Sequence, residues 1–232
     1  MRDPEPLRQA AANCRAFKKD SEFYWSYEFE GLQFAPIKLP GSKLRHTRPR
    51  NVQEIRIEME VSLRGVCLDG GDLNDPLQNL VVGCKIEGDT VAGTLTSCAW
   101  HLDKEGSTSA DESDEDHPSG ESHFVHPDYH FQYGGRKVWH KEDGEFGTHL
   151  LLESPRLAHP PMDAILAVDF VLANYYGEKW KKLREGSGVY IDLVRTAQER
   201  LWKPYATATA HYWGVLTSAS PWSASLVWPQ LN

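Results

Sequence analysis

The clearest pattern in the chain is the alternation of apolar and polar residues in the segment Val52 to Leu63, which is strict from Ile55 onward. Every second side chain is apolar and would share one face of a strand: Ile55, Ile57, Met59, Val61 and Leu63. One apolar and one polar face is typical of an antiparallel sheet that covers a core on one side. The aromatic run 23–29 and the apolar runs 80–87 and 91–102 predict further strands, with Gly88-Asp89 as a tight hairpin turn between the last two.

Beyond residue 158 the pattern becomes helical. The segment from His159 to Asp163 predicts a helix start, because proline is tolerated in a first turn and an early aspartate suits the helix dipole. Residues 164–173 are apolar on every side except at Asp169, which predicts a buried helix whose carboxylate pairs with Arg156 or a strand histidine. Further helices are expected over 178–185 and from 188 until Pro204, where the proline should end the last one.

Strands first and helices afterwards predict an α+β protein: a single antiparallel β-sheet, a meander, followed by a C-terminal helical layer packed on one face. We expect the 232 residues to form one domain, 1–232. Residues 104–122 are rich in Ser, Gly, Asp and Glu and contain no large apolar side chain. We expect this acidic insert to be disordered, because it has nothing to bury.

The charge of the chain is unevenly distributed. The formal net charge is -8, but seven carboxylates against one lysine give the acidic insert -6 of it. The rest of the chain is close to neutral, so the net charge neither favours nor excludes a nucleic-acid partner. One loop is basic and is a candidate for phosphate or nucleic-acid contact through Lys43, Arg45, Arg48 and Arg50; its alternative is a solvated loop.

A polar row is predicted on the strand that follows the acidic insert. By alternation, His126, Asp128, His130 and Gln132 would share one face, with Tyr129, Phe131 and Tyr133 on the other. If the insert is a long hairpin loop, it brings a preceding histidine and aspartate alongside. The candidate catalytic set is then His101, Asp103, His126, Asp128 and His130.

Imidazoles beside carboxylates can serve as acid and base near neutral pH. The reaction that needs least extra machinery is hydrolysis or transfer of an RNA phosphodiester. The cofactor is unknown: histidines and an aspartate could hold a divalent metal, but no spacing of the HExxH or paired-Cys type indicates one, and no metal site is assigned. The alternative is a solvent-facing sheet surface without chemistry.

The stretch from His101 to Gly135, with its Asp and its His-Pro-x-x-His strand, resembles small bacterial toxin–antitoxin proteins of the TumE kind. The resemblance implies a bacterial conflict system, either toxin–antitoxin or anti-phage defence. It assigns no catalytic role to any residue.

The C-terminal tail is aromatic and predicts a surface that binds a partner. Its candidate anchors are Tyr212, Trp213, Trp222 and Trp228, since Trp and Tyr are enriched at interface centres. No run approaches the roughly 20 apolar residues that span a bilayer, the start shows no signal-peptide pattern, and the four cysteines read as small buried hydrophobes. We expect a cytoplasmic protein with no membrane partner.

The favoured function is a non-catalytic, partner-binding subunit of an intracellular bacterial multi-protein system, in defence or toxin–antitoxin biology. A protein partner is expected first and nucleic acid second. The alternative is a histidine-dependent nuclease or hydrolase that uses the cluster on the sheet face.

Overall fold

The structure is a computed structural model that describes residues 3–40, 44, 50–68, 75–104, 127–134, 157–217 and 222–227. Its centre is one eight-stranded antiparallel sheet in the order β1-β2-β4-β5-β6-β7-β8, with β3 paired to β4. The strands are β1 (Arg15–Lys19), β2 (Glu22–Gln33), β3 (Ile37–Lys38), β4 (Val52–Leu68), β5 (Leu77–Thr90), β6 (Leu95–Lys104), β7 (Tyr129–Tyr133) and β8 (Leu157–Ala158). The predicted meander is confirmed.

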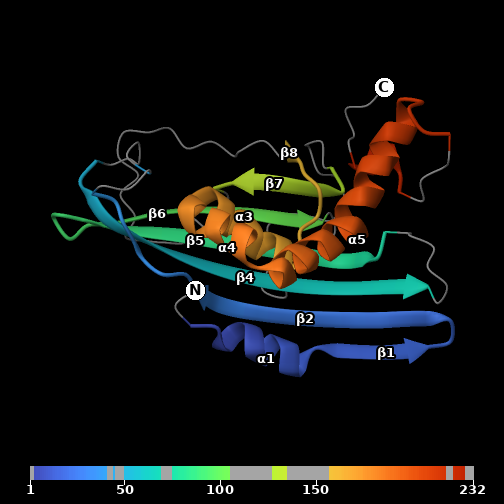
Figure 1. The fold of residues 1–232 in the computed structure, drawn as a ribbon, viewed down its shortest axis with the longest axis horizontal. Helices are drawn as coiled ribbons and strands as arrows, with labels where there is room; N and C mark the ends of the chain where they lie inside the picture. Colours follow the sequence, from blue (N-terminus) through green and yellow to red (C-terminus); the bar gives the residue numbers. More distant parts are fainter. Residues whose placement is uncertain are drawn as a thin grey trace, which may run out of the picture.

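The helices lie mostly at the C-terminal end of the chain and pack on one face of the sheet (Figure 1). α1 (Glu5–Asn13) runs beside β2. The C-terminal layer consists of α3 (Ala164–Tyr175), α4 (Gly177–Gly186), α5 (Gly188–Tyr212) and α6 (Ala224–Val227). The α+β class is therefore as predicted. No helix in the described ranges is long and apolar enough to cross a membrane.

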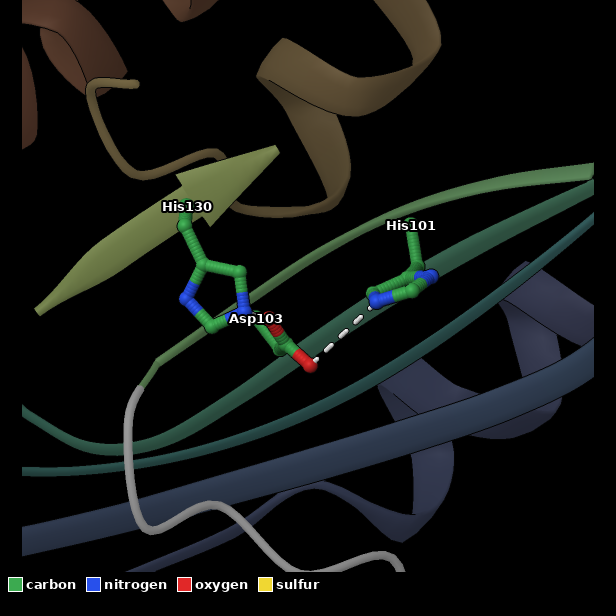
Figure 2. Close-up of side chains that lie close together, drawn as sticks. All are labelled: His101, Asp103 and His130. Carbon is green, nitrogen blue, oxygen red and sulfur yellow. Dashed lines mark ion pairs between the residues drawn. The ribbon is translucent and has the colours of Figure 1, made fainter. Parts of the chain in front are cut away.

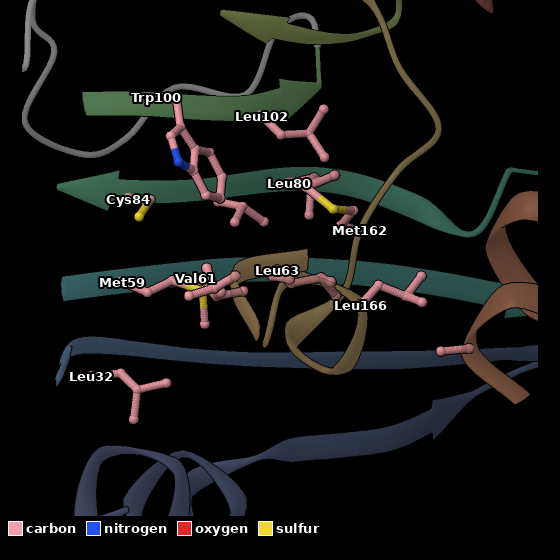
Figure 3. Packing of buried hydrophobic residues seen from close by; sticks show 14 of the residues in the cluster. Leu32, Met59, Val61, Leu63, Leu80, Cys84, Trp100, Leu102, Met162 and Leu166 are labelled. Atoms are coloured by element: carbon pink, nitrogen blue, oxygen red, sulfur yellow. The ribbon is translucent and has the colours of Figure 1, made fainter. Parts of the chain in front are cut away.

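The core forms between this helical layer and the apolar face of the central strands. Met59, Val61 and Leu63 of β4 are almost fully buried, as the alternation predicts, and they face Leu166 from α3 (Figure 3). Trp100 and Leu102 of β6 belong to the same core. Further members of the core are Leu80, Val82, Cys84, Met162 and Ala167. Each large aliphatic side chain buried in this way contributes about 1.5–3 kcal/mol.

The prediction of a hairpin turn at Gly88-Asp89 is wrong. β5 continues through both residues to Thr90, and the turn to β6 follows it. Gly88 is needed for close packing, because a Cβ there would lie 2.7 Å from Cγ1 of Val52 on the neighbouring strand. Asp89 pairs with the Arg56 guanidinium across the strands.

The prediction that Pro204 ends the last helix is also wrong, since α5 runs through it to Tyr212. Proline in a helix interior removes one backbone hydrogen bond and costs about 3 kcal/mol. Here Pro204 is buried between Leu201 and Tyr205, which are themselves core residues. Burial of this stripe outweighs the local preference to stop.

Three smaller expectations need revision. Lys104 is the last residue of β6 and hydrogen-bonds Asp75, so the acidic insert starts after it; residues 105–122 lie outside the described residues.

The predicted partner of Asp169 was Arg156 or a strand histidine. In the structure Asp169 accepts hydrogen bonds from residues of α4 and α5, and Arg156 lies outside the described residues. Cys14 and Cys67 are exposed, unlike the buried Cys84.

Candidate functional site

Two neighbouring strands bring three of the five predicted catalytic residues together. His101 and Asp103 are two residues apart on β6 and therefore share one face. The antiparallel register places Asp103 opposite His130 and His101 opposite Gln132 of β7. This face is the one turned away from the helical layer, because Trp100 and Leu102 alternate with the pair and point into the core.

Both imidazoles point at the same carboxylate (Figure 2). Nε2 of His130 lies 2.8 Å from Oδ1 of Asp103, and Nε2 of His101 lies 3.7 Å from Oδ2. One donor atom from each of the three residues lies within 4.8 Å of the others. We call these three residues the His–Asp–His cluster.

The cluster is partly shielded from solvent: His130 is buried, and His101 and Asp103 are partly exposed. His130 and Gln132 are only 4% and 6% exposed, although their side chains face away from the helices. Nδ1 of His130 lies 3.3 Å from the carbonyl oxygen of Pro127, three residues earlier in the chain. Both ring nitrogens of His130 are therefore next to oxygen atoms, and the ring has a fixed orientation.

The strand end beside the cluster is anchored on the opposite face. Lys104 and Tyr129 are paired across the strands, and both bind the carboxylate of Asp75, at 2.7 and 2.6 Å. Burial and the neighbouring Asp75 raise the pKa of Tyr129 far above its usual range, so the phenol remains a donor. This contact ties the start of β5 to β6 and β7 and limits movement at His130.

The other two residues of the predicted catalytic set, His126 and Asp128, are not members of the His–Asp–His cluster. Asp128 lies one residue before β7 and is not in the cluster. His126 lies outside the described residues. Two hollows of the described surface lie elsewhere: one is lined by Gln33, Arg56 and Lys85, and the other lies between α1 and β2.

Of the predicted basic contact loop, the structure describes Arg50 alone, which is exposed just before β4. Lys43, Arg45 and Arg48 lie outside the described residues. The loop therefore stays a prediction.

The aromatic tail divides into an exposed and a buried part. Trp213 is 64% exposed at the end of α5, and its ring contacts Tyr212 at 5.2 Å between centroids. Trp222 is 4% exposed and stacks on Tyr129 of the sheet, so it is a core residue and not a surface anchor. Trp228 lies outside the described residues.

Two residues that the sequence reasoning missed adjoin Trp213. Val215 is 73% exposed and Leu216 39% exposed. The available signal was their position directly after a helix end, within a run that has no charged residue from Tyr212 to Ser220. We call Tyr212, Trp213, Val215 and Leu216 the α5 end surface.

Comparisons with family models, curated proteins and solved structures give no match to this chain. The function is therefore argued from the chain's own residues.

Proposed function

We propose that the protein is a non-catalytic subunit that binds a protein partner through the α5 end surface. The observation that carries the proposal is the exposure of Trp213, Val215 and Leu216 next to one another. Contiguous apolar side chains at the surface of a soluble domain mark interaction sites, and tryptophan is a frequent anchor of such interfaces.

The shape of the helical layer supports this proposal. α5 buries a stripe that runs from Val194 through Leu201 to Ala208, whereas its last turn contributes no residue to the core. In Figure 1 this end of α5 extends away from α3 and α4. An apolar helix end that its own fold does not cover is suited to insert into an apolar groove of a partner.

The state of the His–Asp–His cluster is a second support. An acid–base enzyme needs imidazole nitrogens that reach a substrate in a concave site. His130 is buried, and both of its ring nitrogens lie beside oxygen atoms of the protein itself. The bacterial defence or toxin–antitoxin setting that we include in the proposal rests on the short TumE-like resemblance alone.

Co-purification tests the proposal. The tagged chain is isolated from its native cells as wild type and as a Trp213→Ala, Val215→Ala double variant. A discrete partner should accompany the wild type and be depleted about 5–30-fold in the variant, as loss of anchor contacts worth about 1–2 kcal/mol predicts.

Val91→Ala is the matched control, because Val91 is 72% exposed at the turn after β5, away from α5. It should retain the partner. Equal retention by the double variant would contradict the proposal.

A histidine-dependent hydrolase is the second candidate, and the convergence of two imidazoles on Asp103 favours it. Cleavage of RNA and DNA by the isolated protein is measured with and without divalent metal. Acid–base participation contributes about 10²–10⁴-fold, so cleavage that disappears in His130→Ala would replace the first proposal with this one.

A further inference from the structure

We propose that the His–Asp–His cluster is a binding site for one divalent transition-metal ion, with Zn²⁺ as the best match. The proposal is independent of partner binding at α5. It starts from the donor set: two imidazole nitrogens and one carboxylate oxygen, a set that suits zinc and related ions far better than Mg²⁺ or Ca²⁺, which prefer oxygen ligands alone.

The contacts of His130 suit a ligand of a metal ion. When Nδ1 carries the ring hydrogen, it can donate to the carbonyl oxygen of Pro127, which only accepts. A neutral ring then presents the lone pair of Nε2 to Oδ1 of Asp103, at 2.8 Å, and a carboxylate also has only lone pairs to offer. In this tautomer both atoms can be ligands of one metal ion placed between them.

The distances suit a metal ion. Donor atoms around tetrahedral zinc lie about 3.3 Å apart, because each is about 2.0–2.1 Å from the ion. The observed separations from Asp103 are 2.8 Å to His130 and 3.7 Å to His101. The first distance is to Oδ1 and the second to Oδ2, and one ligand atom from each of the three residues lies within 4.8 Å of the other two.

The surroundings of the cluster have two further properties of metal sites. A backbone carbonyl that fixes the free nitrogen of a ligating histidine is the common outer contact of such sites, and Pro127 supplies it. Adjacent paired strands hold all three residues in register, which preorganises the ligands. Three protein ligands leave a fourth position for water or for a partner's side chain.

Metal binding by the full-length chain tests the proposal. The protein is stripped with a chelator and titrated with Zn²⁺ by calorimetry, and with Co²⁺ by absorption spectroscopy as a visible probe of coordination. We expect one equivalent per chain and a Co²⁺ spectrum typical of four-coordinate nitrogen and oxygen ligands.

Three variants decide which residues bind. His101→Ala and Asp103→Ala should each weaken binding at least about 10-fold, since ligand loss exceeds the 10–100-fold effect of outer-shell changes. His211→Ala, an exposed histidine on α5, should bind as the wild type does. Circular dichroism checks folding, and the half-buried His101 keeps the test valid if Asp103→Ala unfolds.

Absence of binding by the wild type would overturn the proposal. So would an affinity or a Co²⁺ spectrum that is the same in folded His101→Ala as in the wild type.

Discussion

At the scale of single residues, Asp169 shows how a buried charge can be structural. Its Oδ1 accepts hydrogen bonds from Nε1 of Trp180 at 2.7 Å and from the hydroxyl of Tyr190 at 2.6 Å, with Arg184 at 3.7 Å. One carboxylate on α3 thus joins α4 and α5. Removal of it would leave three polar groups without their partner in a largely buried site.

We predict that Asp169→Ala lowers the free energy of unfolding by about 1–4 kcal/mol, the range of broken buried pairs. Asp169→Leu should cost less, because the larger side chain limits the cavity. Chemical denaturation measures both. Asp192→Ala is the control, since its pair with Arg195 is exposed and should contribute less than about 1 kcal/mol. Equal stability of all three variants would contradict the structural role.

His159 should make stability dependent on pH. Burial lowers its pKa below the ordinary value of 6.5, opposed by the hydrogen bond from Nδ1 to the Pro160 carbonyl. The unfolded chain then takes up a proton at higher pH than the folded chain. Stability from this residue is complete above about pH 6.5 and falls as the pH drops toward the lowered pKa.

We predict that His159→Phe reduces this acid dependence, because the ring contacts with Phe131 and Phe170 can be kept without a titrating group. The slope contributed by one histidine is at most about 1.4 kcal/mol per pH unit. Unfolding midpoints of wild type and variant between pH 5 and 8 give the difference. An unchanged slope would show that His159 does not titrate as its burial indicates.

At the scale of elements, close strand packing explains features that alternation alone does not. Gly65 in β4 lies opposite Trp25, and a Cβ there would come within 2.4 Å of the indole ring and 2.7 Å of the Pro76 carbonyl oxygen. The position admits only glycine because the ring lies over the strand. Overpacking of this kind costs about 1–3 kcal/mol.

Gly65→Ala should therefore lower the unfolding free energy by about 1–3 kcal/mol in a denaturant titration. Gly186→Ala is the matched control at the end of α4, where a Cβ would meet nothing within 4 Å. It should be neutral or slightly stabilising. A Gly65→Ala variant as stable as Gly186→Ala would refute the packing argument.

The same elements show how far the sequence could predict the structure. The period-2 pattern from Val52 predicted β4 and its buried face, because alternation reports directly which side is covered. The predictions at Gly88 and Pro204 were wrong. The local preference of glycine is a turn and that of proline a helix end, but tertiary packing keeps Gly88 within β5 and Pro204 within α5. Of the site, the approach of His101, Asp103 and His130 was predicted from face and register. The Pro127 contact was not, because it depends on backbone conformation.

At the scale of the whole molecule, the two faces of the sheet have separate roles. One is covered by the helical layer and holds the core, and the other carries the His–Asp–His cluster on β6 and β7. The α5 end surface belongs to the helical layer, at the C-terminal end of α5, and none of its residues is part of the cluster. We therefore expect substitutions in the α5 end surface to leave the proposed metal site unchanged, and substitutions in the cluster to leave the proposed partner binding unchanged.

The most direct test of partner binding is photo-crosslinking in living cells, with a photoreactive amino acid placed at position 213 or, as the control, at position 91. With the photoreactive residue at position 213, we predict a discrete product whose mass is the sum of this chain and one partner protein. With the residue at position 91, we predict no product. The product should diminish when Val215→Glu is added, because a charge would then enter the apolar interface. A product of twice the mass of this chain, or no product at position 213, would contradict the account.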